Sequence, residues 1–172
     1  MLDAVVRDIR TNYVEGYTNR CKDGKYIIML DYDRLNIDWV IPELRRLQMD
    51  FNLSDFYIFK SSEESYHAVC FDKVNLSEYV TILKNSTVDI NYINVPLRFG
   101  SKVWTLRVSP KNNVSVEYCS RVLTKEKHIR AKSSAHIQLV EGLFKGFKYM
   151  PNNHDYKLHD ELKEVLFARY PI

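Results

Sequence analysis

Two aspartates, Asp31 and Asp33, are the residues of this sequence whose spacing points most directly to chemistry. They follow an apolar run that begins at Tyr26, just after the turn signal Asp23-Gly24, and this pattern predicts a buried strand over residues 26–33. Alternate side chains of a strand share a face, so both carboxylates are expected on one face, about 7 Å apart. Carboxylates this close raise each other's pKa unless a cation lies between them, and a divalent metal ion would serve. The alternative is a pair of ordinary strand-end acids, one solvated and one capping the next turn.

A serine and a histidine repeat the same spacing further along the chain. Ser65 and His67 open an apolar segment that predicts a strand over residues 65–72, and the same alternation places both side chains on one face. A third acid, Asp89, lies between apolar residues in a segment that alternates like a strand over 88–95. An acid inside a strand needs a partner or a metal, although Asp89 would equally suit a turn at the strand edge.

Two cations accompany the last predicted strand. Arg107 lies within the alternating segment 102–108, and Lys111 follows at its exit. The planar guanidinium of an arginine matches phosphate oxygens, although both cations also suit an ordinary charged surface. Three acids, a serine–histidine pair and two cations together favour phosphoryl-transfer chemistry, in which carboxylates hold two metal ions and cations neutralise phosphates.

The elements that must position these residues alternate between strands and helices. An apolar stripe after Asp38, a helix N-cap candidate, predicts a helix, and a second helix is expected to open at Asn75 or Ser77 and to run through Leu83. Between them, segments 55–60 and 65–72 predict a hairpin. This order predicts an α+β fold, an antiparallel sheet with helices on one face, as in ferredoxin-like and RNA-recognition-motif-like folds.

The spacing of apolar residues predicts helices near both ends of the chain. Residues 2–14 show helical apolar spacing, 15–25 are polar and indicate a loop, and 114–172 are expected to be mainly helical, with stripes around 137–144 and 158–166. At 172 residues the chain is expected to form a single domain, with a core over 1–113 and a helical extension over 114–172.

Composition excludes several classes of protein. The three cysteines are far apart and form no Cys-x-x-Cys pair, so neither a disulfide framework nor a zinc knuckle is indicated. No apolar run is long enough to span a membrane, and Met1-Leu2-Asp3 does not begin a signal peptide. We therefore expect a cytoplasmic protein with no membrane partner.

The net charge of +3 is small, but basic residues gather in one segment. Residues 121–148 contain seven Lys or Arg against two Glu, which makes this segment a candidate track for nucleic-acid phosphates. The candidate contacts are Lys125, Lys127, Arg130 and Lys132. An ordinary solvated helix face would show the same charges.

The three acidic and polar blocks resemble the archaeo-eukaryotic primase superfamily. The family's motifs are an apolar run with DxD or DxE, then SxH, then an apolar residue followed by Asp, and the matching residues here are Asp31-Tyr32-Asp33, Ser65-Tyr66-His67 and Val88-Asp89. The segment from Leu106-Arg107 to Lys111 is similar to the basic strand that follows in many members. The resemblance covers about residues 24–111.

The resemblance implies a primase catalytic core with an RNA-recognition-motif-like fold. Its implied activity is template-directed nucleotidyl transfer, as a DNA primase or polymerase in plasmid or viral replication. Asp31, Asp33 and Asp89 would bind Mg²⁺ or Mn²⁺, while Ser65 and His67 would contact the phosphates of the incoming nucleotide, assisted by Arg107 and Lys111. Implied partners are a DNA template, nucleoside triphosphates and a separate helicase. The alternative is a non-catalytic nucleic-acid-binding replication protein on the same fold.

Overall fold

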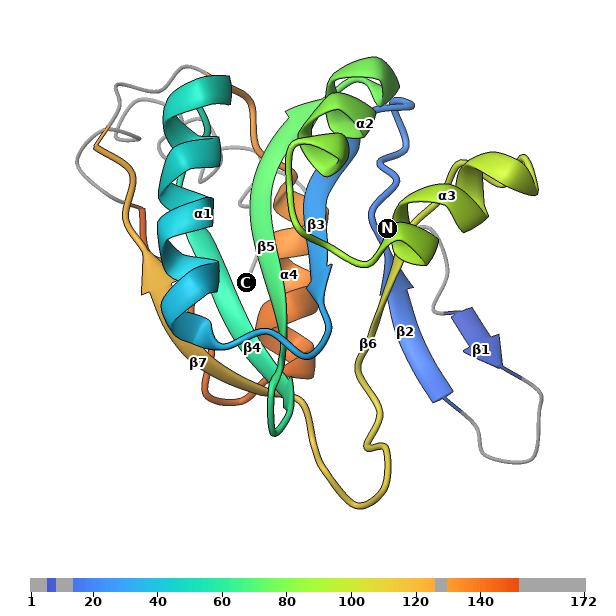
Figure 1. Ribbon diagram of the computed structural model, residues 1–172, viewed down its shortest axis with the longest axis vertical. Helices are drawn as coiled ribbons and strands as arrows, with labels where there is room; N and C mark the ends of the chain where they lie inside the picture. The colour runs from blue at the N-terminus through green and yellow to red at the C-terminus, as the bar shows by residue number, and fades with distance from the viewer. Residues whose placement is uncertain (1–5, 9–13, 126–129, 152–172) are drawn as a thin grey trace, which may run out of the picture.

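A four-stranded antiparallel sheet lies at the centre of the computed structural model, which describes residues 6–8, 14–125 and 130–151 (Figure 1). Its strands, in spatial order, are β3 (Tyr26–Tyr32), β5 (Ser65–Val74), β4 (Phe56–Ser62) and β7 (Glu117–Val122). β4 and β5 form the hairpin that the sequence predicts, and β5 pairs with β3 on its other side. The α+β class is confirmed, and the RNA-recognition-motif-like relationship stays a prediction.

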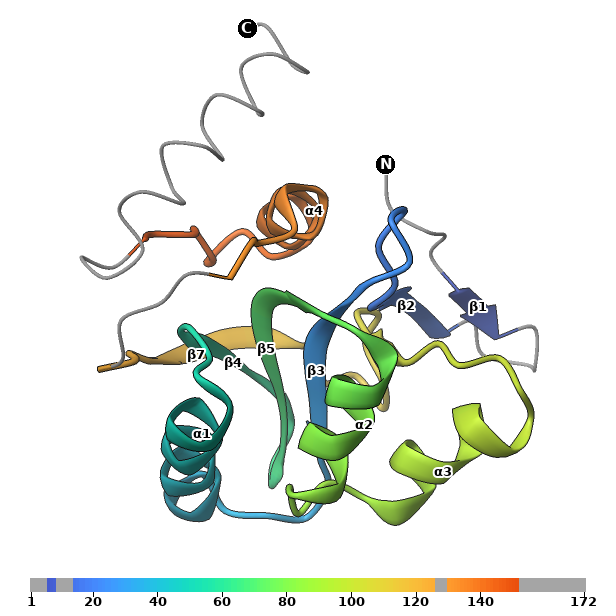
Figure 2. The same cartoon turned by 90° about the horizontal axis from the view of Figure 1, so that it is seen from above.

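The first strand of this sheet, β3, is buried on both faces. Ile28 and Leu30 belong to a core beneath helices, whereas Ile27 and Met29 belong to a second core on the opposite face. Figure 2 shows these layers, with α1 and α2 on one side of the sheet and α4 on the other. Two-sided burial explains why the β3 sequence is a continuous apolar run and not an alternating one.

Two helices cover one face of the sheet, as expected. Helix α1 (Ile37–Phe51) begins after the N-cap Asn36, whose side chain accepts from the backbone N–H of Asp38 at 2.9 Å. Asp38 therefore lies in the first turn and is not the cap, because Asn36 has the extended backbone that a cap requires. Helix α2 (Leu76–Lys84) begins after Asn75, one of the two positions predicted.

The strand predicted over residues 88–95 is wrong, because the segment forms helix α3 (Ile90–Arg98). The side chain of Asp89 accepts from the backbone N–H groups of Asn91 and Tyr92 and so caps the helix. Pro96 cannot donate to the Tyr92 carbonyl, but the indole N–H of Trp104 donates to it at 2.9 Å. A tertiary contact thus supplies the hydrogen bond that proline removes from this helix.

A second, three-stranded sheet contains residues 6–8 and 14, the described part of the helix predicted over 2–14, and part of the loop predicted over 15–25. Its spatial order is β1 (Val6–Asp8), β2 (Val14–Thr18) and β6 (Thr105–Arg107). β6 occupies only part of the strand predicted over 102–108. Gly16 of β2 is required by close packing, because a Cβ there would lie 2.6 Å from the Leu106 carbonyl oxygen. β2 therefore forms through pairing with β6, and local sequence alone does not indicate it.

The segment after residue 114 is only partly helical within the described residues. Helix α4 (Ser134–Leu143) is confirmed and packs against the sheet through Ile137 and Val140. Residues 117–122, however, form β7, which pairs with the edge of β4 and so satisfies backbone groups that would otherwise be left open. The apolar stripe predicted over 158–166 lies outside the described residues.

A buried ion pair ties the chain preceding α4 to the far end of β5. The Lys132 ammonium lies 3.3 Å from a carboxylate oxygen of Asp72, and both side chains are almost completely buried. The Ser54 backbone N–H and hydroxyl also donate to Asp72, at 2.8 and 2.6 Å. The carboxylate is therefore satisfied from several directions.

We expect Asp72→Asn to lower the free energy of unfolding by about 3–5 kcal/mol, because it leaves the Lys132 ammonium buried without its counter-charge. Asp23→Asn is the matched control, since Asp23 pairs with Lys73 at the surface at 3.1 Å, and should cost at most about 1 kcal/mol. Urea denaturation of both variants measures the difference. Equal losses would show that the Asp72–Lys132 pair is not a determinant of stability.

Candidate functional site

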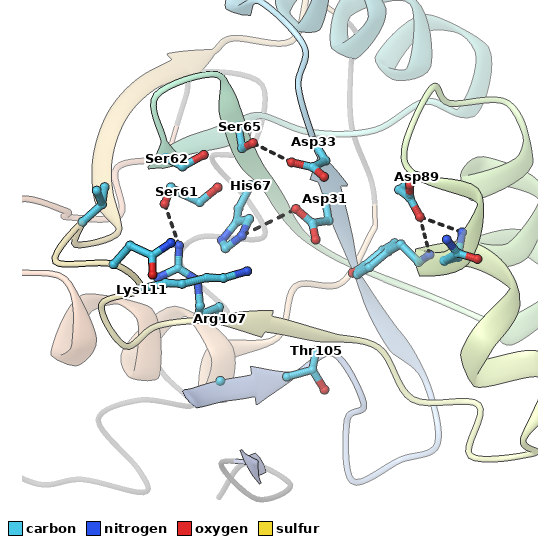
Figure 3. Close-up of a pocket in the computed structure, with 15 residues that line it drawn as sticks. Asp31, Asp33, Ser61, Ser62, Ser65, His67, Asp89, Thr105, Arg107 and Lys111 are labelled. Atoms are coloured by element: carbon cyan, nitrogen blue, oxygen red, sulfur yellow. Dashed lines mark hydrogen bonds and ion pairs between the residues drawn. The ribbon is translucent and has the colours of Figure 1, made fainter. Parts of the chain in front are cut away.

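All seven residues selected from the sequence for phosphate chemistry line one cavity of about 830 Å³ (Figure 3). They come from β3 and its exit, β5, the start of α3, β6 and the turn after it. These residues are Asp31, Asp33, Ser65, His67, Asp89, Arg107 and Lys111. Segments far apart in sequence therefore meet at one end of the central sheet.

The pairing of β3 with β5 brings the first two motifs together. Asp31 lies directly opposite His67 in the antiparallel ladder, and the His67 Nε2 atom is 3.6 Å from the Asp31 carboxylate. Both side chains lie on the same face of the sheet as Met29 and Val69. Residues of α4 and β6 pack against that face. The face is open only where the acids emerge.

Asp33 and Ser65 form a second polar pair at the rim of this opening. The Ser65 hydroxyl donates to the Asp33 carboxylate at 2.8 Å and accepts from the backbone N–H of Arg34 at 3.3 Å. Figure 3 shows the Asp31 and Asp33 carboxylates between this part of β5 and Asp89. Ser65 therefore orients one carboxylate oxygen and leaves the other available to a ligand.

Burial and charge shift the ionisation of the central pair in opposite directions. Burial, with the nearby charges of Asp33 and Asp89, raises the pKa of Asp31 to about 6. Burial and the Arg107 guanidinium lower the pKa of His67 to about 3. At neutral pH the imidazole is therefore uncharged in the free protein and offers a hydrogen bond rather than a positive charge. A bound phosphate would raise its pKa again.

Asp89 reaches the cavity from the N-terminus of α3 and not from a strand. One of its carboxylate oxygens accepts from Asn91 N at 2.7 Å, while its charge is close enough to raise the pKa of Asp31. Helix α3 is anchored to β3 because the Tyr92 hydroxyl donates to the Met29 carbonyl at 3.3 Å, and the Tyr79 hydroxyl of the neighbouring α2 donates to the same carbonyl at 2.6 Å. The sequence therefore identified a cavity residue but assigned it to the wrong element.

The guanidinium of Arg107 is hydrogen-bonded to the protein backbone and is not fully free to bind a ligand. Its two terminal nitrogens donate to the backbone carbonyls of Ser61, at 2.6 Å, and Ser109. The guanidinium therefore joins the end of β4 to the turn after β6 and supplies positive charge beside His67. These two bonds use two of its five N–H donors, so a phosphate would be bound through the remaining ones.

Lys111 is carried by a tight turn that enters the rim of the cavity. Its backbone N–H donates to the Val114 carbonyl and its carbonyl accepts from the Val114 N–H, at 3.1 and 3.0 Å. Asn112 and Asn113 both have positive φ, as a type I′ turn requires, and asparagine tolerates that conformation. The Asn-Asn pair places the exposed Lys111 at the cavity.

Several lining residues were missed by sequence reasoning. Ser61 and Ser62 belong to the end of β4, beyond the strand predicted over 55–60, and Asn91 and Thr105 come from α3 and β6. Such small polar residues carry no spacing signal of their own. Only the antiparallel pairing of β4 with β5 brings the two serines beside Ser65 and His67.

Of the four basic residues proposed as nucleic-acid contacts, the three that the structure describes lie away from the cavity. Lys132 is buried against Asp72, and Arg130 pairs with Glu78. Asp72 is seven residues along β5 from Ser65, about 23 Å in an extended strand. Lys125 is exposed but follows β7 at the same far end, and Lys127 lies outside the described residues. Lys132 and Arg130 are therefore structural cations, which corrects the expectation.

The donor set suits a magnesium ion that a substrate completes. Among the described residues, no three His, Cys, Asp or Glu side chains lie close enough together to hold a metal on their own. Asp31 and Asp33 supply carboxylate oxygens on one face of the cavity, with Asp89 across from them. Mg²⁺ is commonly held by one or two carboxylates, water and substrate phosphates and not by an all-protein cage. The residues present fit that mode of binding.

We expect Asp31→Asn to stabilise the protein at about pH 7.5 by about 1 kcal/mol, a value reduced for the solvent screening of a side chain that is 37% exposed. Since its pKa is raised from 3.8 to about 6, folded Asp31 binds its proton more tightly than the unfolded chain does. Stability therefore falls as the pH rises through that window.

Urea denaturation across the pH range checks this expectation. The gain from Asp31→Asn should vanish below about pH 4, where Asp31 is protonated in both states. Asp38→Asn, which removes an exposed carboxylate in the first turn of α1, is the control and should give no gain. A gain that does not depend on pH would contradict the electrostatic explanation.

Comparison with known proteins identifies no relative of this chain. No family model, no curated protein and no solved structure matches it. None of the described helices has both the length and the hydropathy needed to cross a membrane. The resemblance to the primase superfamily stays a prediction from the motifs.

Proposed function

We propose that the chain is a template-directed nucleotidyltransferase of the primase-polymerase type, acting with Mg²⁺ or Mn²⁺ in plasmid or viral DNA replication. One observation carries the proposal. Seven residues chosen from the sequence for a single reaction, on segments distant in the chain, line one cavity. An unrelated set of surface charges would not be expected to converge in this way.

The charge of the cavity favours metal-dependent binding of a nucleotide. Three carboxylates face two cations, and His67 is neutral at neutral pH, so the free cavity is net negative. A nucleoside triphosphate carries about four negative charges, which this cavity would repel without added cations. Asp31 and Asp33 would hold divalent ions, whose positive charge would remove that conflict.

Three cavity residues would each contribute differently to binding the triphosphate. Lys111 is an exposed donor at the rim, and His67 offers an uncharged N–H to a phosphate oxygen. Arg107 adds positive charge from behind His67 while it holds the cavity walls together. When bound, the metal ions would stabilise the attacking 3′-oxygen and the departing pyrophosphate.

We expect the double variant Asp31→Asn/Asp33→Asn to lose at least about 100-fold in nucleotide incorporation, because metal binding supplies several kcal/mol of transition-state stabilisation. The measurement is extension of a primed single-stranded template with labelled nucleotide in Mg²⁺ or Mn²⁺. Asp50→Asn, an exposed acid on α1, is the control. Absence of incorporation by the unaltered chain with both metals would favour the non-catalytic nucleic-acid-binding alternative.

The variant Asp89→Asn distinguishes the two proposed roles of Asp89, as the cap of α3 and as a metal-binding carboxylate. Asparagine caps helices about as well as aspartate, so α3 should remain folded while the charge is lost. We expect incorporation to fall at least about tenfold with an unchanged melting temperature, since one carboxylate ligand is lost. If Asp89→Asn retains full activity while Asp89→Ala loses about 1 kcal/mol of stability, Asp89 is a helix cap and not the third carboxylate.

A further inference from the structure

An exposed apolar ridge leads away from the candidate site along α3. Asn91, Val95 and Phe99 are spaced four residues apart and therefore lie along one side of the helix and its C-cap. Phe99 is 76% exposed and Val95 is 46% exposed, values that are unusual for large apolar side chains. Figure 2 shows α3 at the side of the molecule, on the side away from α1. The exposure of Phe99 and Val95 leaves this ridge open to a ligand.

The ridge is continuous with the proposed nucleotide cavity. A second cavity of about 400 Å³ runs between Val95 and Phe99 on one side and Val103 and Trp104 on the other. It shares three lining residues with the first cavity, and these are Asn91, Tyr92 and Thr105. The two cavities are therefore adjacent, and a ligand lying along α3 would be directed toward the carboxylates of the candidate site.

Positive charge accompanies the ridge. Arg98 and Lys102 flank Phe99, both are exposed, and neither pairs with an acid among the described residues. Residues 90–104 contain no Asp or Glu. This part of the surface thus combines an exposed aromatic ring with two free cations, whereas Lys132 and Arg130 at the far end of the sheet are neutralised by acids.

We propose that α3 binds single-stranded nucleic acid, with a base stacked on Phe99 and the backbone phosphates on Arg98 and Lys102. An aromatic ring interleaved with cations is the combination that holds single strands without sequence preference, because every base has a face that can stack. If the proposed function holds, this strand is the template that enters the cavity. The binding of nucleic acid itself does not depend on catalysis.

The test is a fluorescence-anisotropy titration of the full chain with a short labelled oligothymidylate, which has no structure of its own. We expect Phe99→Ala to weaken binding about 5- to 100-fold, the range for loss of one stacking contact, and Phe99→Tyr to bind like the unaltered chain. Met49→Ala, which removes an apolar side chain that is 69% exposed on α1, should have no effect.

A salt titration tests the cations separately. Arg98→Gln/Lys102→Gln should reduce the slope of log affinity against log salt by about 1.4, since each phosphate contact on a single strand contributes about 0.7. Lys22→Gln/Lys25→Gln removes two exposed lysines at the opposite end of β3 and should leave the slope unchanged. Equal effects of the two double variants would show non-specific attraction and overturn the proposal.

Two further outcomes separate this proposal from the proposed function. Binding of oligothymidylate by an unaltered chain that incorporates no nucleotide with either metal would refute the enzyme and support the α3 surface. Incorporation by a chain whose oligothymidylate affinity is unchanged by Phe99→Ala would overturn the surface and leave the enzyme standing. Self-association lost in Phe99→Ala, with no binding of oligothymidylate, would assign the ridge to a second copy of the chain and would also overturn the proposal.

Discussion

The antiparallel register between β3 and β5 is the constraint on which the candidate site depends. It sets Asp31 opposite His67 and brings Ser65 to Asp33. A shift of one residue would turn either pair toward the opposite face, because strand side chains alternate. That shift is opposed by packing, since the same register buries Ile28 and Leu30 under the helices and Ile27 and Met29 under α4 and β6. Core packing thus fixes the geometry of the polar residues.

The candidate site accordingly lies at the boundary between the buried core and the solvent-exposed end of β3 and β5. Asp31 is close enough to the core for burial to raise its pKa, and its neighbouring acids add to the effect. This arrangement is unfavourable in the free protein and becomes favourable when a cation binds, which is typical of sites that hold metals or phosphates. The protein tolerates the repulsion because β3 is held from both faces, and Ser65 and the Arg34 backbone fix the rim.

Tertiary hydrogen bonds fix the position of helix α3. Tyr92 ties it to the Met29 carbonyl, and the Trp104 indole replaces the hydrogen bond that Pro96 cannot make. These contacts bring Asp89 to the cavity at one end of the helix and leave Phe99 exposed at the other. The proposed catalytic acid and the proposed nucleic-acid surface therefore belong to one rigid element.

The sequence by itself determined β3, the β4–β5 hairpin, α1, α2 and α4, because each carries a strong local pattern of apolar residues and a turn or cap signal. It also identified the seven cavity residues. Two-residue spacing within strands indicated Asp31, Asp33, Ser65 and His67, whereas Asp89, Arg107 and Lys111 were indicated by their charge and their place beside apolar segments. Tertiary structure decided the rest. Residues 88–95 alternate like a strand but form a helix because Asp89 caps it and Trp104 completes it. β2 forms by pairing with β1 and β6, β7 forms by pairing with β4, and Lys132 is buried against an acid distant in sequence. A local pattern cannot reveal which distant group will satisfy a hydrogen bond or a charge.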